Sequence, residues 1–214
     1  KYFYDPEFRF FISIIFFIFV ITVLINLFSP NSNADISDLL FQSISIITTT
    51  GFSVGDTSGW APSIGFLLLI GAFIGACSGS VGGGVKSWRV LIMINYAYIT
   101  LKKMIHPNAV ISLKIGNKSV DDSVASSVWG FFSIYVISFI ILLLGLLITG
   151  LDFESAFSAI GACLNNLGPG LGEVSNNYQS VTPVGKIILS FAMILGRLEI
   201  FTLLVLLTPA FWNK

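Results

Sequence analysis

Long apolar runs alternate along the chain with shorter apolar runs and with polar turns that contain glycine. The long runs predict helices at about 9–29, 62–103, 123–149 and 182–207, each long enough to cross about 30 Å of hydrocarbon. The second of these runs is interrupted by Ser78–Gly84, in which four of seven residues are glycine. Glycine costs about 1 kcal/mol per helical position relative to alanine, so this run is predicted to be a broken helix.

Two shorter apolar runs, about 35–47 and 152–164, predict helices that are too short to span a membrane. Each is followed by a polar loop centred on glycine, at 48–53 (Thr-Thr-Thr-Gly-Phe-Ser) and at 165–170 (Asn-Asn-Leu-Gly-Pro-Gly). Polar backbone at membrane depth is tolerated only where it is buried in protein or lines a watery path. The pattern therefore indicates an ion pore.

The chain repeats internally, with the order helix, short helix, polar loop, helix occurring twice. An offset of 117 residues, which becomes 121 after the second polar loop, aligns residues of the same type. The aligned pairs are Asp35 and Asp152, Gly51 and Gly168, Pro62 and Pro183, and Gly75 and Gly196. The sequence predicts two repeats, 1–122 and 123–214, related by an axis along the membrane normal.

Composition indicates a polytopic membrane protein, because 55% of residues are apolar and 10% are charged, against roughly 25% charged in soluble domains. Six of the eleven Lys and Arg residues lie within 86–118, whereas 30–62 and 150–185 contain none. The positive-inside rule then places both termini and the 102–122 loop in the cytoplasm, and the two polar loops outside. The chain does not begin with Met, and we expect it to be a fragment.

The polar loops have the chemistry of a cation path. Glycine permits backbone conformations in which carbonyl oxygens turn toward an axis and replace the water of an ion. The preceding short helix directs its partly negative C-terminal end at the same place, which favours cations. Asp56 and Glu173 would raise the local cation concentration, although a solvated loop surface explains them equally well.

Two further features lie deeper in the predicted membrane segments. The glycine run resembles the phosphate-binding pattern G-x-x-x-x-G-K-[ST], but Val85 interrupts it and the βαβ context is missing. An unwound segment beside a cavity, or a kink that allows close helix packing, explains it better. Arg197 is a costly charge in an apolar run, and we expect it to face the ion path or to be bonded to carbonyls for stability alone. Lys86 is expected to reach the cytoplasmic interface.

Several segments resemble the bacterial TrkH/KtrB (Trk/Ktr/HKT) superfamily of potassium-uptake transporters. Residues 46–53 resemble the third selectivity filter of that family and residues 165–172 the fourth. Residues 193–202, which contain Gly-Arg-Leu-Glu, resemble its last helix. Members of the family carry four repeats, so the chain resembles the C-terminal half of one. The fold implied is all-α, with two helix–pore helix–filter loop–helix repeats that form half of a pseudo-fourfold pore.

The resemblance implies potassium uptake across the bacterial inner (plasma) membrane, with K⁺ as the transported ion. The filter carbonyls implied are those of Thr48, Thr49, Thr50, Gly51, Asn165, Asn166, Leu167 and Gly168. The gate implied is the broken helix below the filter, with Gly82, Gly83, Gly84, Lys86 and Arg197. A glycine at both filter centres is what accompanies K⁺ selectivity in this family.

The resemblance also implies partners. They are an N-terminal half with two further repeats, a second copy in a homodimer, membrane lipid, and cytoplasmic nucleotide-binding (RCK-type) regulatory subunits that contact the basic 102–118 loop and the Lys86 region. No cofactor is expected in this chain, and no nucleic acid partner. The sequence contains no nucleophile–base set or paired carboxylates, so we do not expect an enzyme. A secondary transporter of a small solute and a non-conducting membrane scaffold remain alternatives.

Overall fold

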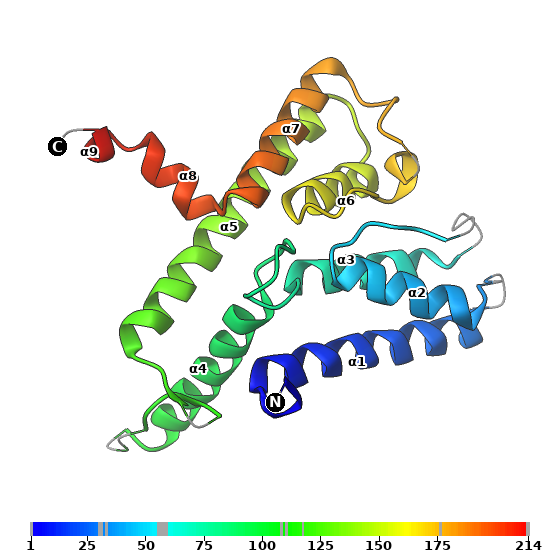
Figure 1. Ribbon diagram of the computed structural model, residues 1–214. Helices are drawn as coiled ribbons and strands as arrows, with labels where there is room; N and C mark the ends of the chain where they lie inside the picture. Colours follow the sequence, from blue (N-terminus) through cyan, green and yellow to red (C-terminus); the bar gives the residue numbers. More distant parts are fainter. Residues whose placement is uncertain are drawn as a thin grey trace.

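The computed structural model describes residues 2–212, except positions 30, 31, 33, 55–59, 108, 110, 117 and 176. The helices form two groups that follow each other in the sequence, α1–α3 and α5–α7, and α4 lies between them in the chain (Figure 1). The elements are η1 (Tyr2–Tyr4), α1 (Pro6–Phe28), α2 (Ile36–Ile47), α3 (Pro62–Ile74), α4 (Ser87–Ile105), β1 (Lys114–Ile115), β2 (Lys118–Ser119), α5 (Asp122–Ile148), α6 (Phe153–Leu164), η3 (Gly172–Val174), α7 (Pro183–Arg197), α8 (Ile200–Leu207) and α9 (Pro209–Trp212).

The beginnings of the helices follow from local sequence. A proline occupies the first turn of α1, α3 and α7, where its fixed φ suits a helix and its missing N–H is not needed. Asp5, Asp152 and Thr182 cap α1, α6 and α7 by accepting a hydrogen bond from a backbone N–H. Hydrogen bonds from the side chain and backbone of Ser155 lower the pKa of Asp152, which lies in the loop outside the helices.

Each group of helices has its own apolar core. Leu39, Ile47, Ile64 and Leu68 are buried where α1, α2 and α3 meet, and a second cluster fills the space between α5, α6 and α7. A third cluster, around Ile92, joins α4 to α5 and to the short antiparallel pair β1–β2. Contacts of α3 with α6, and of α4 with both α1 and α5, connect the two groups.

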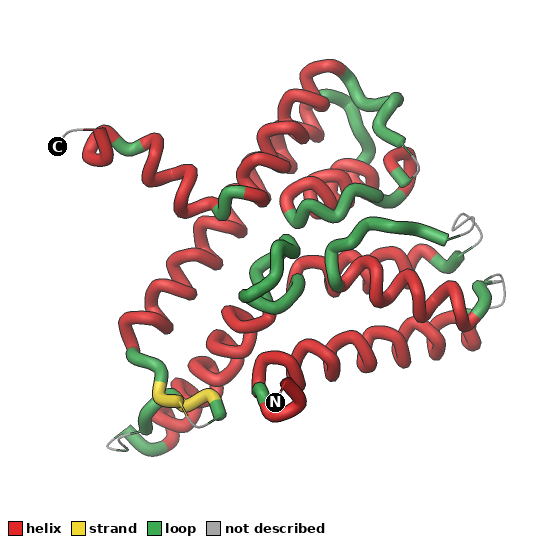
Figure 2. The backbone as a smooth tube through the Cα atoms, viewed as in Figure 1, coloured by secondary structure: helices red, strands yellow, loops and turns green. Residues whose placement is uncertain are grey.

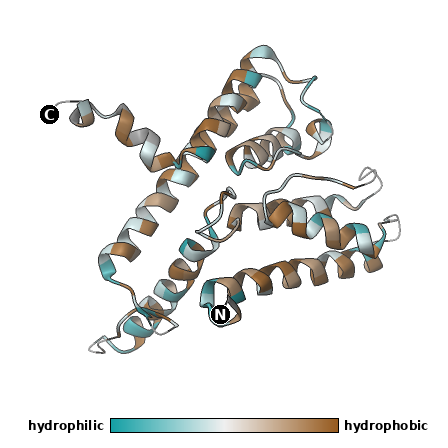
Figure 3. Cartoon of the chain, viewed as in Figure 1, coloured by the Kyte–Doolittle hydropathy of each residue, from teal (hydrophilic) through white to brown (hydrophobic). Residues whose placement is uncertain are grey.

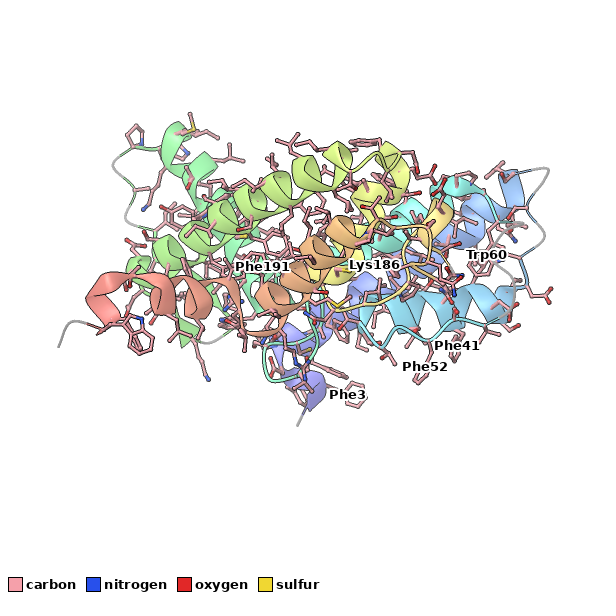
Figure 4. The ribbon with its side chains drawn as sticks, turned by 90° about the horizontal axis from the view of Figure 1, so that it is seen from above. Phe3, Phe41, Phe52, Trp60, Lys186 and Phe191 are labelled. Atoms are coloured by element: carbon pink, nitrogen blue, oxygen red, sulfur yellow. The ribbon has the colours of Figure 1, made fainter. Side chains whose placement is uncertain are left out.

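Much apolar surface remains exposed. In the described part of the chain, α1 and α5 are long and apolar enough to cross a membrane, and few of their residues are buried. Apolar positions predominate along both helices in the view of Figure 3. Phe41 and Phe52 likewise project away from the body of the first group (Figure 4), with 43% and 69% of their surfaces exposed. These surfaces need lipid or further protein to cover them.

The structure confirms the predicted break in the second apolar run, because α3 ends at Ile74 and α4 begins at Ser87. The prediction of one helix over 182–207 is wrong. That run breaks at Leu198 and Glu199, where Glu199 takes a positive φ of 56°. Apolarity alone could not reveal this break, because apolar residues continue on both sides of it.

Candidate functional site

The two polar loops begin with the same helix cap. At the end of α2, the N–H of Thr50 donates to the carbonyl of Ser45 over 2.8 Å. At the end of α6, the N–H of Leu167 donates to the carbonyl of Ala162, also over 2.8 Å. Both bonds belong to Schellman caps, which satisfy carbonyls that the helix end leaves free. The bonded pairs are 117 residues apart, the offset on which the predicted repeat depends.

The backbone also takes left-handed conformations at equivalent positions in the two loops. Thr49 and Asn166 have φ values of 55° and 53°, and Gly51 and Gly168 have φ values of 80° and 108°. Glycine adopts such values freely, and Asn tolerates them. A β-branched residue does not, so Thr49 is a strained outlier. Two loops far apart in sequence therefore share one backbone conformation.

The polar loops lie next to each other in the middle of the molecule (Figure 2). A Cβ atom added to Gly51 would lie 2.1 Å from the carbonyl oxygen of Leu167, so the first loop packs directly on the second. At Gly168 a Cβ would meet nothing within 4 Å, and only its φ requires glycine. The Tyr178 hydroxyl donates to the Gly168 carbonyl over 2.7 Å and helps to fix that loop.

Side chains from neighbouring helices hold the loops in place. The hydroxyl of Tyr135 on α5 donates to Oδ1 of Asn165, a fully buried residue, over 2.6 Å. The hydroxyl of Ser45 donates to the carbonyl of Phe52 over 2.6 Å. Tyr135 is a contributor that the sequence did not reveal, because an aromatic residue in an apolar run is usually core packing. Of the acidic residues expected near the loops, Glu173 is exposed, and Asp56 lies outside the described residues.

Residues 75–86, which we call the glycine loop, connect α3 to α4. The N–H of Val85 donates to the carbonyl of Phe73, and the N–H of Ser87 to that of Ala76, each over 3.0 Å. These bonds close the segment on itself in place of a continuous helix. Gly75 turns the chain with a φ of 72°. Helices flank the loop on both sides, so it lacks the strand that a phosphate-binding loop follows.

The glycine loop touches both polar loops through Gly83. Its N–H donates to Oγ1 of Thr49 over 2.9 Å. On its other side, a Cβ added to Gly83 would lie 1.8 Å from the carbonyl oxygen of Asn165. The structure thus brings the sequence-predicted Thr49, Asn165 and Gly83 into one cluster, and no side chain larger than hydrogen fits at Gly83.

Charged side chains hold the glycine loop from the α7–α8 break. Nη1 of Arg197 donates to the carbonyl of Val81 over 3.0 Å. Nζ of Lys86 lies 3.1 Å from Oε1 of Glu199, and Nη2 of Arg89 lies 2.7 Å from its Oε2. Lys86, which is expected to reach toward the cytoplasmic interface, is thus held in an ion pair with Glu199. The sequence did not single out Glu199 or Arg89 as partners, although a charge in an apolar run is a usable signal.

A cavity of about 150 Å³ lies among these groups. The main chain at 80–84 and the side chains of Lys86, Arg89, Arg197 and Glu199 line it. Three cationic groups face one carboxylate, so the charge around the cavity is net positive. The arrangement can therefore oppose the passage of a cation while the glycine loop is in this position.

The fold and this site define a helical, polytopic membrane protein in which half-length helices deliver polar loops to the interior. The family model "TrkH: Cation transport protein" matches residues 1–214. The chain belongs to the TrkH family, which confirms the resemblance seen in its sequence motifs.

Curated relatives agree with this assignment. The Trk system potassium uptake protein TrkH of Halomonas elongata is 47% identical over 216 residues, and that of Escherichia coli K12 is 46% identical over 217. Each alignment covers 100% of this chain and 45% of the relative. The crystal structure of the potassium transporter TrkH from Vibrio parahaemolyticus superposes with a TM-score of 0.91 at 45% identity, over 99% of this chain and 46% of that one. The chain spans about half the length of these relatives.

Proposed function

We propose that this chain forms half of a K⁺-conducting pore in a Trk-type uptake system. The observation that carries the proposal is the pair of polar loops with one shared backbone conformation, in contact at Gly51 and Leu167. Two such loops surround an ion only in part. The remaining loops come from two further repeats, which fits a chain that spans 45% of its relatives. The repeats 1–122 and 123–214 then contribute two quarters of a pseudo-fourfold pore.

Backbone carbonyls of residues 48–51 and 165–168 bind K⁺ in this proposal. Oγ1 of Thr48 is bonded to the carbonyl of Ile44 and to Oγ1 of Thr50, so these side chains are engaged within their own segment. The main-chain oxygens are then the groups that replace the water of the ion. The C-terminal ends of α2 and α6, which immediately precede the loops, add partial negative charge.

The glycine loop is the gate. Gly82, Gly83 and Gly84 lie beneath the polar loops, and the positive charge of Lys86 and Arg197 raises the barrier for a cation. Opening requires the loop to leave the cluster around Gly83. In this proposal the protein moves ions without chemistry, and this chain carries no cofactor.

The remaining parts of the proposal concern location and partners. The distribution of Lys and Arg puts both termini and the 102–122 loop on the cytoplasmic side of the bacterial inner membrane. The basic 102–118 segment is the surface for a nucleotide-binding regulatory (RCK-type) subunit. The exposed apolar faces of α1 and α5 meet lipid, the other half of the pore, or the second copy of a homodimer.

The filter assignment is tested by Gly168→Ser in the complete transporter, reconstituted in liposomes. A side chain at φ 108° is unfavourable, so the backbone shifts and K⁺/Na⁺ discrimination falls. Gly150→Ser is the matched control, because Gly150 has a φ of 94°, also has nothing within 4 Å, and lies outside the loops. Unchanged selectivity in Gly168→Ser refutes the filter. Proton-coupled solute uptake without K⁺ current would support a secondary transporter instead.

A further inference from the structure

We propose that the Thr49 side chain is a latch that couples the glycine loop to the ion-binding backbone. Its hydroxyl holds Gly83 in place, so the position of the glycine loop and the conformation of the first polar loop change together. Thr49 is thus a positioning residue for gating, in addition to the carbonyl it supplies. The inference rests on the proposed function, and its test below separates the two.

The first argument is the conformation of Thr49 itself. A threonine with a φ of 55° costs free energy, and such strain persists only where surrounding contacts determine it. The equivalent position in the second polar loop is Asn166, a residue that tolerates this conformation. In this position, Oγ1 of Thr49 accepts a hydrogen bond from the Gly83 N–H over 2.9 Å, a bond that Asn166 does not make.

The second argument is that this hydroxyl reaches outside its own segment. In the same Thr-Thr-Thr run, Oγ1 of Thr48 bonds to the carbonyl of Ile44 at the end of α2 and to Oγ1 of Thr50. Those two side chains stabilise the local turn. Thr49 instead accepts from a residue 34 positions away in the glycine loop. Its hydroxyl therefore responds to movement of that loop.

The third argument is the position of Gly83 between the two polar loops. The residue bonds to Thr49 on one side and packs on the Asn165 carbonyl on the other. A movement of the glycine loop that opens the path breaks the first contact and uncovers the second carbonyl. Two sites that share one two-state element influence each other reciprocally. Ions in the filter will therefore bias the glycine loop, and the loop will bias ion binding.

The test compares Thr49→Val with Thr49→Ser in single-channel recordings of the complete transporter. Valine keeps the shape and branching of threonine but cannot accept the bond, whereas serine keeps the hydroxyl. A neutral hydrogen bond lost from the closed state raises the ratio of open to closed dwell time by about 2- to 12-fold in Thr49→Val. Thr49→Ser should stay near the wild-type ratio. Ser43→Ala is the control, because the Ser43 hydroxyl bonds only to the carbonyl of Leu39 in its own helix.

A second readout does not depend on current. Val85 in the glycine loop is buried, so Val85→Cys places a shielded thiol there, in a background with Cys77→Ser and Cys163→Ala. Modification of this cysteine by a thiol reagent should be faster in Thr49→Val, and should depend on K⁺ concentration. Equal rates and equal dwell ratios in the valine and serine variants refute the latch. A wild-type protein that passes no K⁺ refutes the proposed function, while the modification rates still test the latch.

Discussion

Replacement of Gly83 by alanine should open the path for K⁺ in the complete transporter. The change adds one methyl group at the point where the glycine loop touches both polar loops. Its Cβ would lie 1.8 Å from the carbonyl oxygen of Asn165 and 2.5 Å from the carbonyl carbon. Both are main-chain atoms, so rotation of a side chain cannot make room.

The size of the effect follows from that distance. Real Cβ atoms stay at least 3.0 Å from other heavy atoms, so the glycine loop and the polar loop must separate by about 1.2 Å. A separation of this size strains or breaks the 2.9 Å bond from Gly83 to Thr49. Overpacking of a tight site costs about 1–3 kcal/mol. Because this cost falls on the docked position of the loop, the ratio of open to closed transporter should rise by roughly 5- to 160-fold.

K⁺ flux into liposomes, with Rb⁺ as tracer, measures this change directly. Gly79→Ala is the matched control, because it is the same substitution in the same loop at a position where the added Cβ meets nothing within 4 Å. The control should keep wild-type flux. If Gly83→Ala and Gly79→Ala conduct alike, contact between the glycine loop and Asn165 does not limit conduction, and the gate must lie elsewhere. If Gly83→Ala has the same unfolding temperature as the wild-type protein but conducts less K⁺, the glycine loop supports the structure of the filter.

Two further changes test the surroundings of the site. Glu199→Gln removes the carboxylate that Lys86 and Arg89 share. Thermal unfolding in detergent should show that the free energy of unfolding falls by about 1–2 kcal/mol, a loss that the partial exposure of the pairs and added salt make smaller. An unchanged unfolding midpoint at low salt would show that the pairs do not stabilise the fold. Asp152→Ala removes the cap of α6 and should lower the free energy of unfolding by about 1 kcal/mol. Asp35 holds the equivalent position before α2 but makes no capping bond, so Asp35→Ala should lower it by less than about 0.5 kcal/mol. Equal losses in the two variants would contradict the capping argument.

Much of the fold could be predicted from local sequence. Apolar run length, prolines at helix beginnings and the glycine-rich interruption locate α1 to α6 and the beginning of α7 to within a few residues. The break between α7 and α8 could not be predicted, because the polar residues in 193–207 are Arg197, Glu199 and Thr202 alone, and a continuous helix fits that pattern equally well. At the break, Glu199 accepts a hydrogen bond from Arg89, a residue 110 positions away, and no local pattern encodes that contact.

The candidate site could be predicted from local sequence only in part. Polar residues around a glycine after a short helix revealed both polar loops and the glycine loop. The contacts among them are long-range, and no local pattern encodes the bond from Gly83 to Thr49 or that from Tyr135 to Asn165. Sequence identified the parts, and only the folded chain shows which side chains join them.

The two groups of helices meet where the chain has two breaks. The chain breaks between α3 and α4 over the glycine loop, and between α7 and α8 at Leu198 and Glu199. Arg197, just before the second break, holds the carbonyl of Val81, while Glu199, just after it, holds Lys86 at the end of the loop. The junction between α7 and α8 thus contacts the glycine loop at two points. In the proposed gating, a displacement of the glycine loop that uncovers the polar loops has to release these contacts or carry the α7–α8 junction with it, so that junction takes part in the opening.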